Sequence, residues 1–270
     1  MPRQSASVRD ALSAAEDALR AAGCDTPRLD AELLIAHAMG VGREALFLDA
    51  NGGVPPAATR RAMELVRRRV AREPVAYILG KKGFRYITLH VDRRVLVPRP
   101  DTELLVELGV KLPEGARVHD VGTGSGAVAL AIKHERPDLV VSASDASEDA
   151  VEVARGNAAA LGLDVPVTVL SNGLPDGEFD LVVANLPYVR EDEWSTLEPE
   201  LTRYEPREAL VSGEDGLDAI RALVNEAPAG TLLALEHSHA QAAAVRSLLL
   251  EAETHRDLAG RERVTVGRAP

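Results

Sequence analysis

The hydrophobic residues follow one spacing in the first 75 residues and another after Arg117. In the first part they recur at helical intervals; Leu29, Leu33 and Ala36, for example, follow the capping and proline signal at residues 25–27 (Asp-Thr-Pro). In the second part, short apolar runs alternate with helical stretches. The pattern predicts a helical N-terminal region followed by an α/β region.

A further helix is predicted from about Pro56 to Arg72. One of its faces is small or apolar, at Ala58, Ala62, Leu65, Val66 and Val70. The remaining positions carry five arginines, namely Arg60, Arg61, Arg67, Arg68 and Arg69. This basic face is either a solvated surface or a docking surface for an acidic partner.

The second region reads as strands and helices in alternation. Strands are expected at 117–121, 139–145, 165–170, 179–184 and 230–236, and helices at 126–135, 147–161, 215–227 and 239–252. Such alternation is typical of a parallel sheet covered on both faces. Residues 253–268 instead predict an antiparallel hairpin at one edge, and 83–97 predict a hairpin that links the two regions.

Composition and charge narrow the classes of partner. The 270 residues, 46% of them hydrophobic, fit a soluble globular protein of one large domain or two unequal ones. Residues 1–80 hold 11 basic and 10 acidic residues, whereas the remainder holds 20 and 32, a net charge of −12. Nucleic-acid affinity rests largely on Lys and Arg displacing counterions, so this balance argues against a nucleic-acid substrate.

Several absences in the sequence shape the remaining expectations. No apolar stretch approaches the roughly 20 residues that span a bilayer, and the N-terminal MPRQSASVRDAL lacks the apolar core of a signal peptide. The single cysteine, Cys24, cannot form an intramolecular disulfide, and the histidines show no HExxH spacing. We therefore expect a cytoplasmic protein with no metal site and no membrane partner.

A glycine-rich turn follows the first expected strand of the second region. Gly122, Gly124 and Gly126 stand where the backbone must turn sharply and a ligand must approach closely. Asp145 ends the next strand, where a carboxylate can accept both hydroxyls of an adenosine ribose. The pair predicts an adenosine-containing cofactor, but the loop also fits the loose dinucleotide pattern and does not exclude NAD. The chain has no GxxxxGK[ST] and no GxSxG around Ser125, which argues against nucleotidase and esterase activity.

A polar tetrapeptide ends the strand expected at 179–184. Asn185, Leu186, Pro187 and Tyr188 follow this run at the edge of the sheet where Gly124 and Asp145 also lie. The Asn185 side-chain oxygen and the exposed backbone carbonyls after it could hold both hydrogens of a planar NH2 group. Pro187 stiffens the turn, and the Tyr188 ring could cover one face of that group.

This arrangement resembles class I S-adenosylmethionine-dependent methyltransferases that act on amino groups. Six ordered motifs narrow the resemblance to the protein-(glutamine-N5) methyltransferases of the PrmC/HemK family. They are REPVAYILGKKGF (72–84), VLVPRPDTELLVE (95–107), DVGTGSGAVALAI (120–132), FDLVVANLPYV (179–189), YEPREALVSGEDGLDAIR (204–221) and DLAGRERVTVGR (257–268). That family methylates the glutamine of the Gly-Gly-Gln motif in class-1 peptide chain release factors.

The resemblance implies an α/β fold with a Rossmann-like methyltransferase sheet, an antiparallel C-terminal hairpin and a small N-terminal helical domain. The implied domains are a helical substrate-docking domain at 1–75, a hairpin linker at 76–100 and a methyltransferase domain at 101–270. The implied contacts with S-adenosylmethionine are Gly122, Thr123, Gly124, Ser125, Gly126, Asp145, Asn172 and Asn185. Residues 185–188 would bind the substrate glutamine, with Asn185 and Tyr188 as catalytic residues.

The sequence departs from the family pattern at three places. Asn172-Gly173 stands where the family has an Asp-aromatic pair at the adenine, LEHSHAQ (235–241) replaces a Glu-x-Gly pattern, and Leu186 replaces proline. Asn-Leu-Pro-Tyr is also the form found in ribosomal RNA adenine dimethylases, so the tetrapeptide alone favours an adenine-specific RNA or DNA methyltransferase. The PRPDTE and EPREAL stretches and the acidic large domain argue for glutamine. A glutamine methyltransferase that acts on a ribosomal protein and a non-catalytic cofactor-binding module are further alternatives.

Overall fold

The computed structural model describes residues 6–171 and 174–270, and the chain divides into two compact units. The first ends at Gly80 and the second begins at Lys81, so the division falls inside the expected 76–100 linker and places the hairpin in the second unit. No helix among the described residues is long and apolar enough to cross a membrane.

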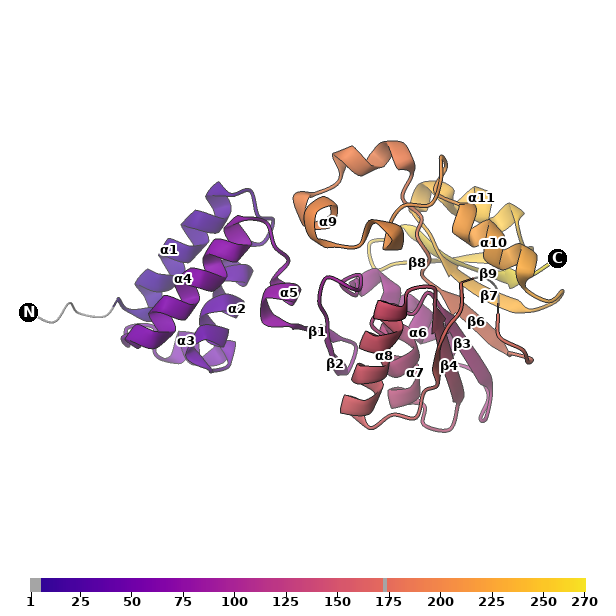
Figure 1. Cartoon of the computed structure of the whole chain (residues 1–270), viewed down its shortest axis with the longest axis horizontal. Coiled ribbons are helices and arrows are strands. Elements are labelled where there is room, and N and C mark those ends of the chain that lie inside the picture. Colours follow the sequence, from indigo (N-terminus) through magenta and orange to yellow (C-terminus); the bar gives the residue numbers. More distant parts are fainter. Residues whose placement is uncertain (1–5, 172–173) are drawn as a thin grey trace, which may run out of the picture. The chain divides into compact units, whose positions relative to one another are not determined.

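The first unit is helical, as its hydrophobic spacing predicts (Figure 1). Its helices are α1 (Val8–Ala21), α2 (Pro27–Met39), α3 (Arg43–Leu48), α4 (Pro56–Val70) and α5 (Val75–Leu79). Ser7 caps α1, because its side chain accepts a hydrogen bond from the Asp10 N–H at 3.1 Å. Pro27 and Pro56 begin α2 and α4, where a missing N–H breaks no helical bond.

The buried faces of α2 and α4 differ from the predicted ones. Leu29 is exposed, whereas Leu34 and Ile35 are buried in the core. The cause is an ion pair between Asp30 and Arg69, both buried, with Asp30 Oδ2 and Arg69 Nε 2.7 Å apart. This pair turns Asp30 inward on α2, and on α4 it removes Arg69 from the predicted basic face and leaves the neighbouring Val70 exposed.

The second unit begins with a hairpin and contains a seven-stranded sheet among its described residues (Figure 1). The hairpin strands are β1 (Lys81–Phe84) and β2 (Ile87–His90). The sheet strands are β3 (Arg117–Val121), β4 (Val140–Asp145), β5 (Val167–Val169), β6 (Leu181–Ala184), β7 (Leu232–Glu236), β8 (Leu250–Arg256) and β9 (Glu262–Arg268). Their order is β5-β4-β3-β6-β7-β9-β8, in which β3 to β7 are parallel and β8 and β9 form the predicted antiparallel edge hairpin.

Helices cover both faces of this sheet. The α-helices are α6 (Glu103–Gly109), α7 (Ala127–Glu135), α8 (Glu148–Leu161), α9 (Pro199–Tyr204), α10 (Asp218–Glu226) and α11 (Ala242–Ser247). Short 3-10 turns are η1 (Pro100–Thr102), η2 (Glu191–Thr196), η3 (Arg207–Ala209) and η4 (His239–Gln241). Alternate residues of β6 and β7, such as Val182 and Leu233, pack with α10 and α11, and α6 contacts the same two strands.

The helix predicted at 239–252 is wrong at its C-terminal end. The structure has η4, then α11 ending at Ser247, and β8 begins at Leu250. Leu250 pairs with Arg268 of β9, so pairing at the sheet edge overrides the helical preference of the Leu-Leu-Leu-Glu run. The helix predicted at 215–227 begins only at Asp218, because Gly216 adopts the left-handed conformation at φ 77°.

The strand order creates a crevice at the carboxyl ends of β3 and β6. From β3 the chain continues to β4 and β5 on one side, and then returns to place β6 on the other. In open α/β sheets, ligands bind at such a switch point, outside the carboxyl ends of the strands.

Candidate active site

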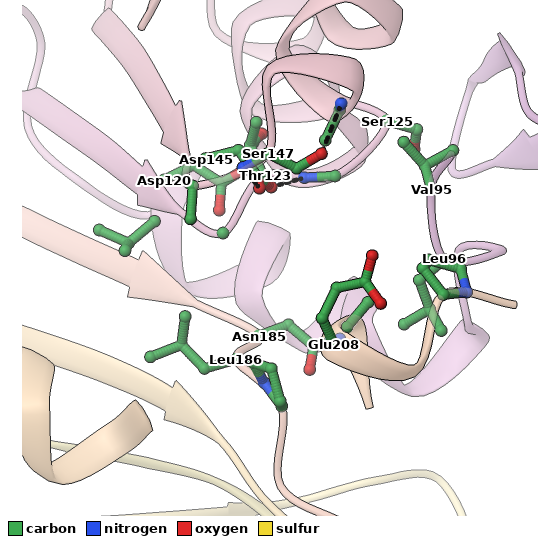
Figure 2. Close-up of a pocket in the computed structure, with 18 of the residues that line it drawn as sticks. Val95, Leu96, Asp120, Thr123, Ser125, Asp145, Ser147, Asn185, Leu186 and Glu208 are labelled. Carbon is green, nitrogen blue, oxygen red and sulfur yellow. Dashed lines mark hydrogen bonds between the residues drawn. The ribbon is translucent and has the colours of Figure 1, made fainter. Parts of the chain in front are cut away.

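A cavity of about 620 Å³ lies at this switch point (Figure 2). Its walls come from the glycine loop after β3, the end of β4 and the tetrapeptide after β6. Two further segments, one before α6 and one before α10, complete the walls. The lining includes residues 94–96, 120–125, 145–147, 185–187 and 206–209 without Arg207. The sheet therefore brings together most of the predicted site residues from separate parts of the chain.

Glycine serves two different purposes in the loop. Gly124 has a φ of 56°, and a Cβ built on it would have no heavy atom within 4 Å, so its bare backbone faces open space. Gly126 has a φ of 83° and caps α7, and a Cβ there would lie 2.8 Å from Leu130 Cδ1. Gly124 thus leaves room for a ligand, whereas Gly126 allows the helix to pack closely.

Asp145 holds the glycine loop as well as facing the cavity. Its Oδ2 accepts a hydrogen bond from Gly124 N at 2.8 Å, and its Oδ1 accepts one from Ser147 N at 3.0 Å. Burial raises the pKa of Asp145 above its ordinary value, against the effect of these bonds. Each carboxylate oxygen has a second lone pair, so the group could still accept two ligand hydroxyls.

Asp120 is a cavity residue that our sequence reasoning missed. Its Oδ2 accepts hydrogen bonds from Thr123 Oγ1 at 2.6 Å and from Ala129 N at 3.2 Å. Burial raises its pKa to about 7, and the bond from Thr123 partly offsets this. The predicted contact Thr123 therefore directs its hydroxyl to the protein. The position of Asp120 one residue before the end of β3, close to the glycine loop, was the signal that could have identified it.

Asn185 follows β6 and directs one end of its amide to the protein. Its Nδ2 donates a hydrogen bond to Thr102 Oγ1 at 3.0 Å. Among the described residues, no donor reaches Asn185 Oδ1, and the residue lines the cavity. The arrangement leaves the acceptor end of the amide available to a ligand, as the tetrapeptide predicts.

The next three residues of the tetrapeptide have different environments. Leu186 and Pro187 line the cavity, and the Leu186 side chain packs against Gly122, where a Cβ would lie 2.9 Å from Leu186 Cδ2. Tyr188 is not part of the cavity lining in the described structure. Its hydroxyl donates to Glu236 Oε1 at 3.3 Å, and the expectation that its ring covers an NH2 group stays a prediction.

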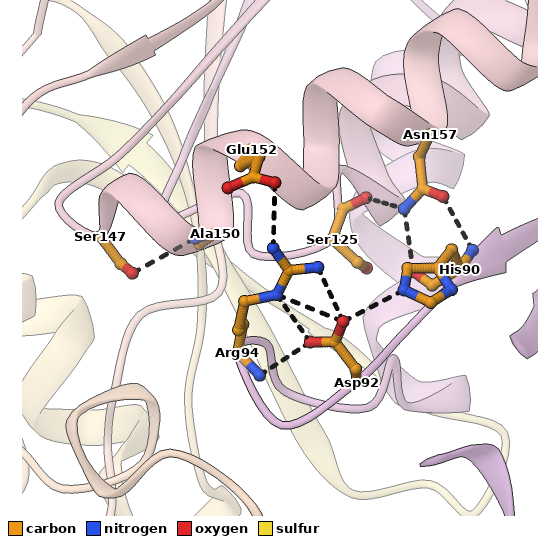
Figure 3. Close-up of polar contacts among 8 residues, drawn as sticks. All are labelled: His90, Asp92, Arg94, Ser125, Ser147, Ala150, Glu152 and Asn157. Atoms are coloured by element: carbon orange, nitrogen blue, oxygen red, sulfur yellow. Dashed lines mark hydrogen bonds and ion pairs between the residues drawn. The ribbon is translucent and has the colours of Figure 1, made fainter. Parts of the chain in front are cut away.

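The side of the cavity formed by Val95 and Leu96 is held by a polar network (Figure 3). Asn157 of α8 accepts from His90 N at 2.7 Å and donates to His90 O at 3.0 Å and to Ser125 O at 2.8 Å. Asp92 then accepts from the Arg94 N–H at 3.0 Å. One buried amide thus ties the end of β2 to the glycine loop.

The segment before α10 contributes two further acidic residues, Glu205 and Glu208. Glu205 is buried and accepts from Val97 N at 3.2 Å and from Arg99 Nη2 at 2.5 Å. These bonds hold the EPREA segment against the PRPDT segment. Figure 2 shows Glu208 extending from the first of these segments into the cavity. The predicted adenine contact, Asn172, lies outside the described residues.

The amino-acid sequence that forms this cavity is similar to known protein families and to known proteins. A model of the PrmC N-terminal domain matches residues 10–80, and a model of the methyltransferase small domain matches residues 100–202. The release factor glutamine methyltransferase of Xylella fastidiosa is 44% identical over 90% of this chain and 94% of its own length. That of Deinococcus radiodurans is 42% identical over 95% of this chain and 96% of its own.

The chain belongs to the release factor glutamine methyltransferase family. The family that the six sequence motifs predicted is therefore confirmed. The catalytic domain of hMettl16, solved with an RNA hairpin, has a TM-score of 0.53 and 13% identity over 77% of this chain and 80% of that one. This similarity shows the fold alone, and it agrees with the predicted methyltransferase sheet of this family member.

Proposed function

We propose that this family member transfers a methyl group from S-adenosylmethionine to the side-chain amide nitrogen of glutamine in the Gly-Gly-Gln motif of class-1 release factors. The observation that carries the proposal is Asn185, which lines the same cavity as Gly124 and Asp145 and whose Oδ1 accepts no hydrogen bond from the described residues. The names of its full-length relatives support the choice of substrate.

The loop and the end of β4 fit an adenosine-containing cofactor. Gly124 leaves backbone open to the cavity, and Asp145 keeps lone pairs for ribose hydroxyls. Residues 122–126 and Asp145 would hold S-adenosylmethionine. When bound, this cofactor supplies a methyl group already activated by a sulfonium, so the protein needs no covalent nucleophile.

The role of Asn185 follows from the chemistry of an amide. The amide nitrogen is a weak nucleophile because its lone pair is delocalised into the carbonyl. Asn185 Oδ1 and the backbone carbonyl of Leu186 would accept the two N–H protons of the substrate. These bonds favour a pyramidal nitrogen whose lone pair points at the methyl group, and orientation of this kind lowers the barrier. Tyr188, whose hydroxyl donates to Glu236 Oε1, remains the second predicted catalytic residue.

The proposal implies a partner and a location. The partner is a release factor, presented as a folded protein with its glutamine loop exposed. Because release factors act on the ribosome, the protein would work in the cytoplasm. The acidic second unit suits a protein substrate better than a polyphosphate one, so neither nucleic acid nor a membrane is proposed as a partner.

Labelled S-adenosylmethionine tests the substrate choice directly. The protein would be incubated separately with a purified class-1 release factor, the same factor with the motif glutamine replaced by alanine, ribosomal proteins, and RNA. We expect label only in the unaltered release factor. Label in RNA would favour an adenine-specific methyltransferase. Label in a ribosomal protein would identify that protein, and not a release factor, as the substrate. No transfer at all would favour a non-catalytic cofactor-binding module.

A further inference from the structure

The turn between β7 and α11, which contains the unusual LEHSHAQ stretch, reaches the last residue of the tetrapeptide. Gln241 Nε2 donates hydrogen bonds to Tyr188 O at 2.9 Å and to Asp215 O at 2.9 Å. Gln241 Oε1 accepts one from Ser238 N at 3.1 Å. The Gln241 residue is only 9% exposed, so this amide joins three distant segments in a largely buried place.

We infer that Gln241 is a positioning residue that fixes the substrate-binding tetrapeptide through the carbonyl group of Tyr188. The inference deepens the proposed function and rests on it, because it concerns how residues 185–188 are held for a glutamine NH2 group. Gln241 is not among the residues that line the cavity in the described structure, so it acts on the site only through Tyr188.

The orientation of the Gln241 amide follows from its three partners. All three are backbone groups, of which an N–H can only donate and a C=O can only accept. The amide oxygen must therefore face Ser238, and the two amide hydrogens must face the carbonyls of Tyr188 and Asp215. Both donors of the side chain are used. A buried amide that is satisfied in this way is rigid, and it holds its partners in one arrangement.

The replacement of the family's glycine by Ser238 is compatible with this role. Ser238 has a φ of −68°, a conformation that any residue adopts. Its side chain accepts a hydrogen bond from the Gln241 backbone N–H, while its own N–H donates to the Gln241 side chain, which forms a capping box. The serine therefore adds a bond to Gln241 and leaves the contact with Tyr188 intact.

Gly216 allows the three segments to meet at the Tyr188 carbonyl. Its φ is 77°, and a Cβ built on it would lie 2.2 Å from Tyr188 O and 2.6 Å from Gln241 Nε2. Any side chain there would displace one of these atoms. The next residue is also fixed, because Val189 N donates to Leu210 O at 2.8 Å. The chain is thus held firmly where it leaves the tetrapeptide.

This attachment matters for the Leu186 carbonyl, the proposed second acceptor for the substrate. No donor among the described residues reaches this oxygen, so its direction depends on the residues on either side. Asn185 is held by its bond to η1, and Tyr188 by Gln241. Pro187 between them has a restricted φ, so a movement of Tyr188 is transmitted to Leu186. Loss of the Gln241 bonds should therefore misdirect the carbonyl and leave the glycine loop in place.

A first experiment follows Tyr188 without substrate or cofactor. In protein with 3-fluorotyrosine at its four tyrosines, the Tyr188 ¹⁹F resonance is identified by its loss in Tyr188→Phe. We expect Gln241→Met, which keeps the side-chain length but donates no hydrogen bond, to shift or broaden this resonance. The matched control is Thr265→Val on β9, which removes a buried hydroxyl bonded to His237 of the same turn and should leave the resonance unchanged.

An identical Tyr188 resonance in the parent and in Gln241→Met would overturn the inference even if the proposed function holds. An equal change in Thr265→Val would also overturn it, because any disturbance of the turn would then have the same effect.

A second experiment measures methyl transfer to a glutamine peptide. We expect Gln241→Met to lower kcat/KM by about tenfold or more, while the Kd of S-adenosylmethionine changes less than about twofold. Gly216→Ala should show the same pattern, because its Cβ would displace the Tyr188 carbonyl. Thr265→Val should stay near the parent in both quantities. A normal kcat/KM in Gln241→Met, or an equal loss of cofactor affinity, would contradict a positioning role.

The variant Gln241→Glu separates the hydrogen bonds from packing, because glutamate has nearly the same shape. An ionised carboxylate would face two carbonyl oxygens and donate to neither, whereas a protonated one can donate to one of them. The kcat/KM of Gln241→Glu relative to the parent should therefore rise as the pH falls. A ratio that does not change with pH would contradict the inference. If the parent transfers no methyl group to glutamine, the proposed function fails, and the fluorine spectra still decide whether Gln241 holds Tyr188.

Discussion

At the scale of single residues, Asp145 ends β4 and Asn185 follows β6, and both line the cavity at the switch point of the sheet. Asp145 and Asn185 could be predicted because each ends an apolar run at one edge of a parallel sheet. The contact of Thr102 with Asn185 could not, because nothing near Thr102 in the sequence shows that η1 lies beside the end of β6. The same limitation applies to Arg69, whose buried partner Asp30 lies on another helix.

Replacement of Asp145 tests the cofactor site. We expect Asp145→Ala to weaken S-adenosylmethionine binding by about 1.5–3 kcal/mol, because charged hydrogen bonds to the ribose are lost. Isothermal titration calorimetry measures this, with Asp149→Ala on the exposed side of α8 as the control. Unchanged affinity in Asp145→Ala would remove this residue from the site, and tight binding of NAD by the parent would overturn the choice of cofactor.

Asp120 should make the stability of the second unit depend on pH. Burial raises its pKa to about 7 in the folded protein, from an ordinary value of 3.8. Between these two values the folded state holds a proton that the unfolded state has released, so stability falls as the pH rises, by up to about 1.4 kcal/mol per pH unit. Asp120→Asn should reduce this slope in the cofactor-free protein.

Urea unfolding at several pH values measures the effect. The fluorescence of Trp194, the single tryptophan of the chain, reports on the second unit. A slope that is equal in the parent and in Asp120→Asn would show that Asp120 does not carry the raised pKa.

At the scale of elements, the sequence predicts a helix or strand correctly where the hydrophobic residues of the segment follow a single spacing. It fails where hydrogen bonding to a neighbouring strand determines the conformation. The strands β6 and β7 lie within their predicted ranges because they are almost wholly apolar and buried. The strands β3 and β4 also lie within theirs, although they carry buried polar residues such as Asp120 and Ser144. The first residues of β8, 250–252, continue a Leu-Leu-Leu-Glu run that predicts helix, and their strand conformation comes from the pairing of β8 with β9, which was expected only from residue 253.

The turn after β6 offers a test of its backbone. We expect Leu186→Pro to keep glutamine methylation within about tenfold of the parent, a barrier change near 1.4 kcal/mol, because the carbonyl at this position is retained. Proline also favours an extended conformation at Asn185, which suits a residue leaving a strand. The loss of the Leu186 contact with Gly122 should lower stability more than activity.

Steady-state kcat/KM for a glutamine peptide and for an adenine-containing RNA decides the outcome. Loss of glutamine activity in Leu186→Pro, or a switch to RNA, would show that the leucine side chain contributes to substrate choice.

At the scale of the whole molecule, the change in hydrophobic spacing was enough to predict a helical unit before an α/β unit. The strand order, with its switch point between β3 and β6, confirms the predicted methyltransferase sheet. What the sequence could not show is which arginines of α4 are exposed. Arg69 is buried with Asp30, Arg68 pairs with Glu73 and Arg61 contacts His37.

The exposed arginines of α4 test whether the first unit helps to hold a protein substrate. Arg60 and Arg67 lie about two helical turns apart on one face. If this face docks an acidic surface, Arg60→Glu with Arg67→Glu should raise the KM for whole release factor by about tenfold, near 1.4 kcal/mol. The KM for a short glutamine peptide should not change. Arg9→Glu, exposed on α1, is the control, and equal effects on both substrates would argue against docking.

The most direct test of the central claim is mass spectrometry of the Gly-Gly-Gln peptide after incubation of release factor and S-adenosylmethionine with the parent or with Asn185→Ala. The account predicts that the parent adds one methyl group to the glutamine side chain, whereas Asn185→Ala adds none although it still binds the cofactor. An unmodified peptide after incubation with the parent, or full methylation by Asn185→Ala, would contradict the account.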